Sequence, residues 1–91
     1  GPAEREIQFA RMKQAVTPGG LLLLHGYTPQ QLAYRTGGPS AVENLYTMAL
    51  LRTAFAEWEI LALREYEAEL AEGSGHKGRS AVIDLIARKP G

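Results

Sequence analysis

The stretch that decides the fold is Thr17-Pro18-Gly19-Gly20-Leu21-Leu22-Leu23-Leu24-His25-Gly26-Tyr27-Thr28-Pro29. Its Pro-Gly-Gly turn stops the preceding segment and redirects the chain. The four leucines that follow show no polar alternation, so they predict a strand over residues 20–27 that is buried on both faces. Such a strand needs helices above and below it, in an α/β layer. Because 91 residues supply little more than this strand's immediate surroundings, we expect the chain to be a piece of a larger enzyme.

The composition excludes several classes of function. Lys plus Arg and Asp plus Glu both number 10, so no net field attracts nucleic acid or anionic lipid. Without cysteine the chain has no disulfides or thiolate metal sites, and we expect a cytoplasmic protein. No apolar run approaches the roughly 20 residues of a membrane span. Residues 1–2 are interpreted as the remnant of a removed tag, which leaves 3–91 as the folded portion.

A helix is predicted before the leucine strand, over residues 3–16. Phe9, Met12 and Val16 recur at i, i+3 and i+7 and form one apolar stripe. Pro18 cannot continue the helix, so the helix must end before it.

A long loop over residues 28–46 and a second helix over 47–56 are predicted to follow the strand. The loop is rich in turn-forming residues and exceeds the usual length of a connection, which is typical of functional or disordered loops. Thr47 or Asn44 is suited to cap the helix. The apolar stripe of this helix consists of Met48, Leu51 and Phe55.

An antiparallel hairpin is predicted at the end of the chain. Its strands cover residues 57–70 and 77–88, on either side of a Gly73-Ser74-Gly75 turn. Period-two alternation places Trp58, Ile60 and Ala62 on one face of the first strand and Glu59, Leu61 and Leu63 on the other. Helix propensity alone also permits a helix over residues 64–72.

Five segments in this order resemble the last third of the class I S-adenosylmethionine-dependent methyltransferases. The nearest subset is the bacterial small-molecule type grouped with tellurite-resistance and type 11 and 12 methyltransferases. The segments are 17–27 (TPGGLLLLHGY), 31–39 (QLAYRTGGP), 43–46 (ENLY), 63–67 (LREYE) and 75–90 (GHKGRSAVIDLIARKP).

The resemblance implies a Rossmann-like α/β fold with sheet order 3-2-1-4-5-7-6, in which strand seven is antiparallel between strands five and six. Residues 20–27 correspond to strand five, 57–70 to strand six and 77–88 to strand seven. The chain is therefore expected to place two helices on a three-stranded mixed sheet of order 5-7-6.

The resemblance also implies S-adenosylmethionine as the cofactor of the parent enzyme and a small molecule as its substrate. In that family a glycine-rich turn after strand one and an acid ending strand two hold the cofactor. This chain has no Gly-x-Gly-x-Gly after a strand. We therefore expect it to bind no cofactor and no metal and to be inactive alone.

Ligands of open α/β sheets lie outside the carboxyl ends of the parallel strands, which here carry several polar and aromatic residues. His25 is the candidate catalytic residue, as a group that orients or deprotonates the methyl acceptor. The candidate substrate-binding residues are Tyr27, Tyr34, Arg35, Tyr46, Tyr66 and His76.

Each candidate has a structural alternative. His25 also fits a hydrogen-bonded residue at the rim of the sheet, and the tyrosines fit packing roles. Asp84, in the middle of a strand, is expected to pair with a neighbouring Arg. His76 with Glu72 gives only a weak indication of a metal pair.

Without strand four, the leucine strand has an exposed edge, so we expect a homo-oligomer formed at this edge or by swapping the hairpin. The alternative function is a free-standing small α+β dimer that binds a ligand or partner without catalysis. A pseudoenzyme subunit that completes a partner's fold is a third interpretation.

Overall fold

The computed structural model describes residues 2–29, 45–71 and 77–91 as two helices and three strands. Their bounds are α1 Pro2–Gln14, β1 Leu21–Tyr27, α3 Met48–Ala54, β2 Glu59–Ala71 and β3 Lys77–Arg88. The predicted elements are therefore present in the predicted order. The bounds of 77–88 are as predicted, and the other elements shift by one to two residues at their ends.

The predicted turn after the first helix is a type II turn. Gly20 N–H donates to the Thr17 carbonyl at 2.8 Å, and Gly19 has a φ of 79°. Pro18 precedes this glycine, at the position where its fixed φ suits such a turn. Because the turn begins at Thr17, α1 ends at Gln14 rather than at Val16.

The N-terminus of α3 is capped by Thr47, one of the two residues predicted for this role. The Thr47 hydroxyl accepts a hydrogen bond from Leu50 N–H at 3.0 Å, and Thr47 itself has extended backbone angles. Its capping position makes Met48 the first helical residue.

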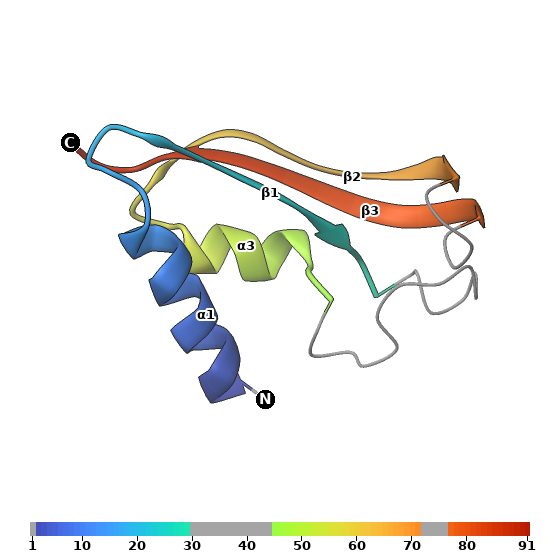
Figure 1. The fold of residues 1–91 in the computed structure, drawn as a ribbon, viewed down its shortest axis with the longest axis horizontal. Coiled ribbons are helices and arrows are strands. Elements are labelled where there is room, and N and C mark those ends of the chain that lie inside the picture. Colours follow the sequence, from blue (N-terminus) through green and yellow to red (C-terminus); the bar gives the residue numbers. More distant parts are fainter. Residues whose placement is uncertain (1, 30–44, 72–76) are drawn as a thin grey trace.

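The sheet has the order β1-β3-β2, as predicted for strands five, seven and six. β3 is antiparallel to both neighbours, so β1 and β2 run in the same direction on either side of it (Figure 1). The prediction of a mixed sheet was wrong for the described strands. β1 and β2 run parallel but are not neighbours, because β3 lies between them, and both hydrogen-bonded pairings are antiparallel.

Both helices cover the same face of the sheet, which we call the inner face (Figure 1). The predicted helix stripes supply its core: Phe9 meets Phe55 edge to face at 5.7 Å, and Phe55 meets Trp58 at 5.4 Å. The buried cluster consists of Phe9, Leu22, Leu24, Leu51, Phe55, Trp58, Ile83, Leu85 and Ala87.

The opposite face, which we call the outer face, is not covered by any described helix. Leu22 and Leu24 are buried, whereas Leu21 is 47 % and Leu23 is 72 % exposed. The expectation that both faces of the leucine strand are buried was therefore wrong for this chain. Two helices suffice for one face only, so the four leucines alternate between core and surface.

A β-bulge between Ile60 and Ala62 changes the predicted faces of β2. Ile60 pairs with Ala87 and packs on the inner core, but Ala62 pairs with Ile86 on the outer face. Leu61 is the extra residue and is 46 % exposed. The predicted common face for Ile60 and Ala62 was wrong, because the bulge inverts the alternation.

Candidate functional site

The candidate site is built from two adjacent rows of residues across the outer face. Residues paired across strands point to the same face of a sheet. One row joins His25 on β1, Asp84 on β3 and Arg64 on β2. The next row joins Tyr27, Val82 and Tyr66 in the same strand order, and Val82 is buried between the two tyrosines.

Asp84 is the centre of the hydrogen bonds in these rows. One of its carboxylate oxygens, Oδ1, lies 2.5 Å from His25 Nδ1. The other, Oδ2, accepts a hydrogen bond from the Tyr66 hydroxyl at 2.8 Å and lies 4.0 Å from Arg64 Nε. The Arg64 guanidinium in turn stacks 4.5 Å from the centre of the Tyr66 ring. We call these four residues, His25, Asp84, Tyr66 and Arg64, the Asp84 cluster.

The cluster keeps Asp84 ionised. Desolvation by the surrounding strands raises the pKa of Asp84, but hydrogen bonds from His25 and Tyr66, the charge of His25 when it is protonated and the charge of Arg64 outweigh it. The pKa of Asp84 therefore lies below its ordinary value. The hydrogen bond to Asp84, with desolvation and the negative charge of Asp84, raises the pKa of Tyr66, so its hydroxyl remains a donor at neutral pH.

The arrangement fixes the orientation of the imidazole. Since Asp84 is an acceptor, the neutral His25 ring carries its proton on Nδ1 and leaves a lone pair on Nε2. The His25 side chain is 58 % exposed, compared with 29 % for Asp84. Within the described residues, Nε2 makes no hydrogen bond, so this atom can accept a proton from a bound molecule.

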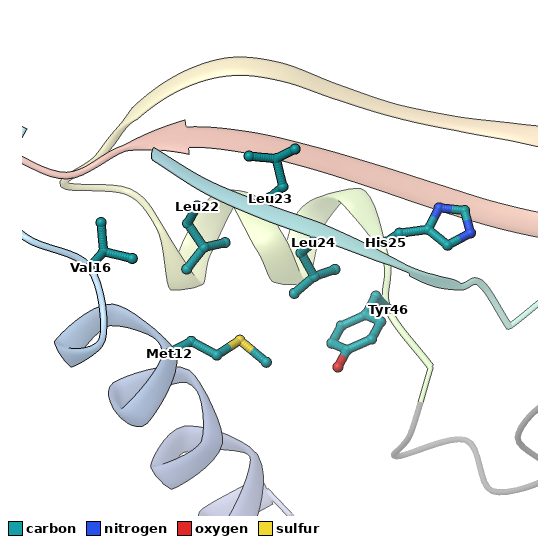
Figure 2. A pocket seen from close by; sticks show the side chains of 7 residues that line it. All are labelled: Met12, Val16, Leu22, Leu23, Leu24, His25 and Tyr46. Atoms are coloured by element: carbon teal, nitrogen blue, oxygen red, sulfur yellow. The ribbon is translucent and has the colours of Figure 1, made fainter. Parts of the chain in front are cut away.

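Two hollows adjoin His25. The smaller, of about 260 Å³, lies against the cluster and is lined by Leu23, Leu24, His25, Asp84, Leu85 and Ile86. The larger, of about 390 Å³, is lined by Met12, Val16, Leu22, Leu23, Leu24, His25 and Tyr46 and lies beside β1 (Figure 2). Figure 2 shows Leu22 and Leu24 directed toward the helices and Leu23 directed to the opposite side. The smaller hollow therefore gives a ligand on the outer face access to His25 and Asp84.

Tyr46 lies on the inner side of β1, away from the Asp84 cluster. Its ring contacts Phe9, with centres 6.2 Å apart, and Arg5 lies 5.3 Å from the ring centre. A methyl group on Gly26 would come within 2.7 Å of the Tyr46 ring, so the glycine permits this close packing. Tyr46 thus shares the larger hollow with His25 but has a packing role.

Of the seven predicted site residues, the structure brings His25, Tyr27 and Tyr66 together on the outer face. Tyr34, Arg35 and His76 lie outside the described residues. Asp84, expected to pair with Arg, meets His25 and Tyr66 more closely than Arg64. Asp84 and Arg64 were not predicted to belong to the site. The predicted turn could have indicated their contact, because a hairpin centred at Ser74 pairs Arg64 with Asp84, as the structure does.

The described part of the chain holds no group of three or more His, Asp or Glu side chains placed to bind a metal ion. Neither described helix is long and apolar enough to cross a membrane. The pair of His76 and Glu72 lies outside the described residues.

Comparison of the chain with models of known protein families and with curated proteins gives no match.

Proposed function

We propose that this chain is the C-terminal, substrate-side part of an S-adenosylmethionine-dependent methyltransferase that acts on a small molecule. The observation that carries the proposal is the sheet order β1-β3-β2. A reversed strand between two strands of common direction is the arrangement that the sequence resemblance implies for strands five, seven and six. If each strand paired with the next strand along the chain, the order would be β1-β2-β3 instead.

The uncovered outer face supports a larger parent protein. An α/β layer has helices on both faces of its sheet. Here the described helices cover the inner face only, and Leu21, Leu23 and Leu61 are each nearly half exposed or more. Further helices of the parent polypeptide would bury these leucines.

The described residues do not fit S-adenosylmethionine. A cofactor of this kind requires a glycine-rich turn that joins a strand to a helix, so that backbone N–H groups can approach it closely. In the described residues, β1 continues into Thr28 and Pro29 and β3 into Lys89, Pro90 and Gly91, so neither strand leads through a glycine-rich turn into a described helix. The proposal therefore assigns the cofactor to another part of the parent polypeptide, and this chain alone is inactive.

The role proposed for His25 is to accept the proton of the methyl acceptor. Asp84 binds Nδ1 of the imidazole, and Nε2 has no hydrogen-bond partner among the described residues. Tyr66 donates to Asp84 from the other side. Base catalysis of this kind increases the rate of methyl transfer most when the acceptor is a hydroxyl or an amine. It adds little to the rate for a soft anion, which needs mainly to be aligned with the methyl group. Tyr27 and Tyr66 flank the site, and Tyr34, Arg35 and His76 remain proposed contacts of the substrate.

Methyl transfer by the polypeptide of the whole reading frame tests this proposal. Labelled S-adenosylmethionine is incubated with a panel of small thiols, hydroxyl compounds, amines and chalcogen anions. Once an acceptor is found, we expect His25→Ala to lower kcat by about 10²–10⁴-fold with unchanged cofactor affinity. Glu59→Gln is the control, because Glu59 is an exposed carboxylate that pairs with Arg88 at the start of β2, and it should leave kcat unchanged.

The outcomes separate the parts of the proposal. Failure of the whole polypeptide to bind or use S-adenosylmethionine contradicts the assignment as a methyltransferase. Methyl transfer that is unaffected by His25→Ala contradicts only the proposed role of His25.

The second candidate is a free-standing α+β module that binds a ligand or partner without catalysis. The observation that favours it is the closed inner core, in which Leu51, Phe55, Ile83 and Leu85 are fully buried without any further segment. A reading frame that starts near Ala3 would support this candidate. An upstream strand, Gly-x-Gly-x-Gly turn and helix would support the methyltransferase.

A further inference from the structure

The two edges of the described sheet differ in their protection against pairing with another strand. The edge strand β2 has a bulge near Leu61 and carries the exposed charged residues Arg64, Glu65 and Glu67. Bulges and charges are the usual devices that prevent edge pairing. The other edge strand, β1, has the sequence LLLLHGY, with no Lys, Arg, Asp, Glu or Pro and no bulge in its register. β1 is therefore the edge open to association.

The backbone of β1 offers a defined set of hydrogen-bonding groups at this edge. Lys89 N–H donates to Gly20 O at 2.9 Å, and Thr28 N–H donates to Ala81 O at 3.0 Å. Since alternate residues of an antiparallel strand bond to the same neighbour, the even-numbered residues of β1 face β3. The odd-numbered residues Leu21, Leu23 and His25 then direct their N–H and C=O groups away from β3. We call these backbone groups the outward set.

This outward set is bounded at both ends. At the carboxyl end, the Tyr27 carbonyl accepts a hydrogen bond from Tyr46 N–H at 2.9 Å, so the segment that leads into α3 occupies the edge there. At the amino end, the type II turn at Gly19 precedes the first strand residue, Leu21. Leu23 is the middle residue of the outward set, and its side chain is 72 % exposed, more than that of Leu21.

We propose that β1 pairs with β1 of a second copy of this chain, antiparallel and about a two-fold axis at Leu23. In this register each Leu23 faces its counterpart, and each Leu21 faces the His25 of the other copy. Each of these pairs exchanges two N–H to C=O hydrogen bonds, because the outward set is symmetrical about Leu23. The two sheets join into one, and closure by the two-fold axis limits the assembly to a dimer.

A second copy fits this edge for three reasons. The outward set matches itself in antiparallel register, and the exposed Leu23 side chains of the two copies meet at the axis on the outer face. The chain has a net charge of zero, so two copies do not repel each other. The pairing also uses the only described strand edge that lacks charges and a bulge.

The inference does not depend on the proposed function. In a longer polypeptide an upstream strand would compete for the same edge, so the test uses the 91-residue chain without cofactor. Sedimentation equilibrium between roughly 10 µM and 1 mM covers the range in which a moderate homodimer dissociates. We expect a monomer–dimer equilibrium with no larger species.

Two variants locate the interface. Leu23→Lys puts two ammonium groups opposite each other at the axis and should raise the dimer Kd by at least about tenfold. Leu61→Lys changes an exposed leucine at the bulge of the other edge strand, β2, and should leave the Kd unchanged. The near-ultraviolet circular dichroism of Trp58, which packs against Phe55, shows whether each variant is folded.

Amide hydrogen exchange of the unmodified chain provides a test that needs no substitution. Protection of the Leu21, Leu23 and His25 amides should increase with protein concentration, whereas that of Leu22 and Leu24 should not. The proposal is overturned by a monomer at all concentrations, by growth beyond the dimer, by equal effects of the two lysine substitutions, or by exchange that does not depend on concentration.

Discussion

At the scale of single residues, the position of Asp84 determines the chemistry of the outer face. It is the only aspartate in the sequence, and it lies in the middle strand with a hydrogen-bonding partner on each side. Its carboxylate orients His25 from β1 and accepts the hydroxyl of Tyr66 from β2. One side chain therefore links all three strands and fixes the tautomer of the candidate base.

The lowered pKa of Asp84 predicts how this link depends on pH. A group whose pKa is lower in the folded than in the unfolded chain stabilises the fold fully above its unfolded value, about 3.9 for Asp. That contribution is lost as the pH falls through the lower pKa of the folded state. The free energy of unfolding of the unmodified chain should therefore exceed that of Asp84→Asn most above about pH 5, and the difference should shrink below about pH 4.

Urea unfolding followed by the fluorescence of Trp58 at several pH values measures this difference. Glu59→Gln is the control, because Glu59 is an exposed carboxylate 3.5 Å from Arg88 and such surface pairs contribute little. A difference between the unmodified chain and Asp84→Asn that does not change with pH would contradict the role assigned to the carboxylate.

The sequence predicts part of this cluster. A hairpin with its predicted turn centred at Ser74 would place Arg64 opposite Asp84 and Tyr66 opposite Val82, which is the observed register of β2 with β3. The contact of His25 with Asp84 was not predictable in this way. It depends on the register of β1 with β3, which are separated by most of the chain and share no turn.

At the scale of elements, lysine side chains join the ends of the helices to the sheet. Lys89, just after β3, donates from Nζ to the carbonyls of Lys13 at 2.8 Å and Val16 at 2.9 Å, where α1 ends. Lys13 in turn donates to the Ala54 carbonyl at the end of α3. The carbonyls at the end of a helix lack partners within the helix and carry partial negative charge, so these ammonium groups stabilise both helix ends.

Lys89→Met is therefore expected to reduce the free energy of unfolding by about 1–2 kcal/mol, the range for a charged group at a partly buried helix end. Arg52→Met is the matched control. Arg52 is exposed in the last turn of α3, and its replacement should cost less than about 0.5 kcal/mol. Thermal or urea unfolding measures both variants, and equal losses would show that Lys89 has no special capping role.

The helix stripes and the turns were predictable from local pattern, but the faces of the strands were not. Phe9, Leu51 and Phe55 lie in the core as their spacing predicts. The run of four leucines predicts burial on both faces, but how far each face is covered depends on the helices available rather than on the strand. The bulge at Leu61 has no local signal such as glycine, so the simple alternation along β2 was misleading.

At the scale of the whole molecule, the two faces of the sheet have different roles. Both helices lie on the inner face, where they cover the buried core (Figure 1). The outer face carries exposed leucines of β1 and the Asp84 cluster. The Gly-Ser-Gly turn predicted that β2 and β3 are neighbours, whereas the position of β3 beside β1 was expected only from the family resemblance. The open outer face was not predicted, and it is the feature that a longer polypeptide would bury.

The most direct test of the central claim is calorimetric titration with S-adenosylhomocysteine of two proteins, the 91-residue chain and the product of its whole reading frame. We expect no heat of binding for the chain, whose sequence has no Gly-x-Gly-x-Gly motif after a strand, and one-to-one binding for the longer polypeptide. Tight binding by the chain alone would contradict the assignment of the cofactor site to another part of the protein. Absence of binding by the longer polypeptide would contradict the assignment as a methyltransferase.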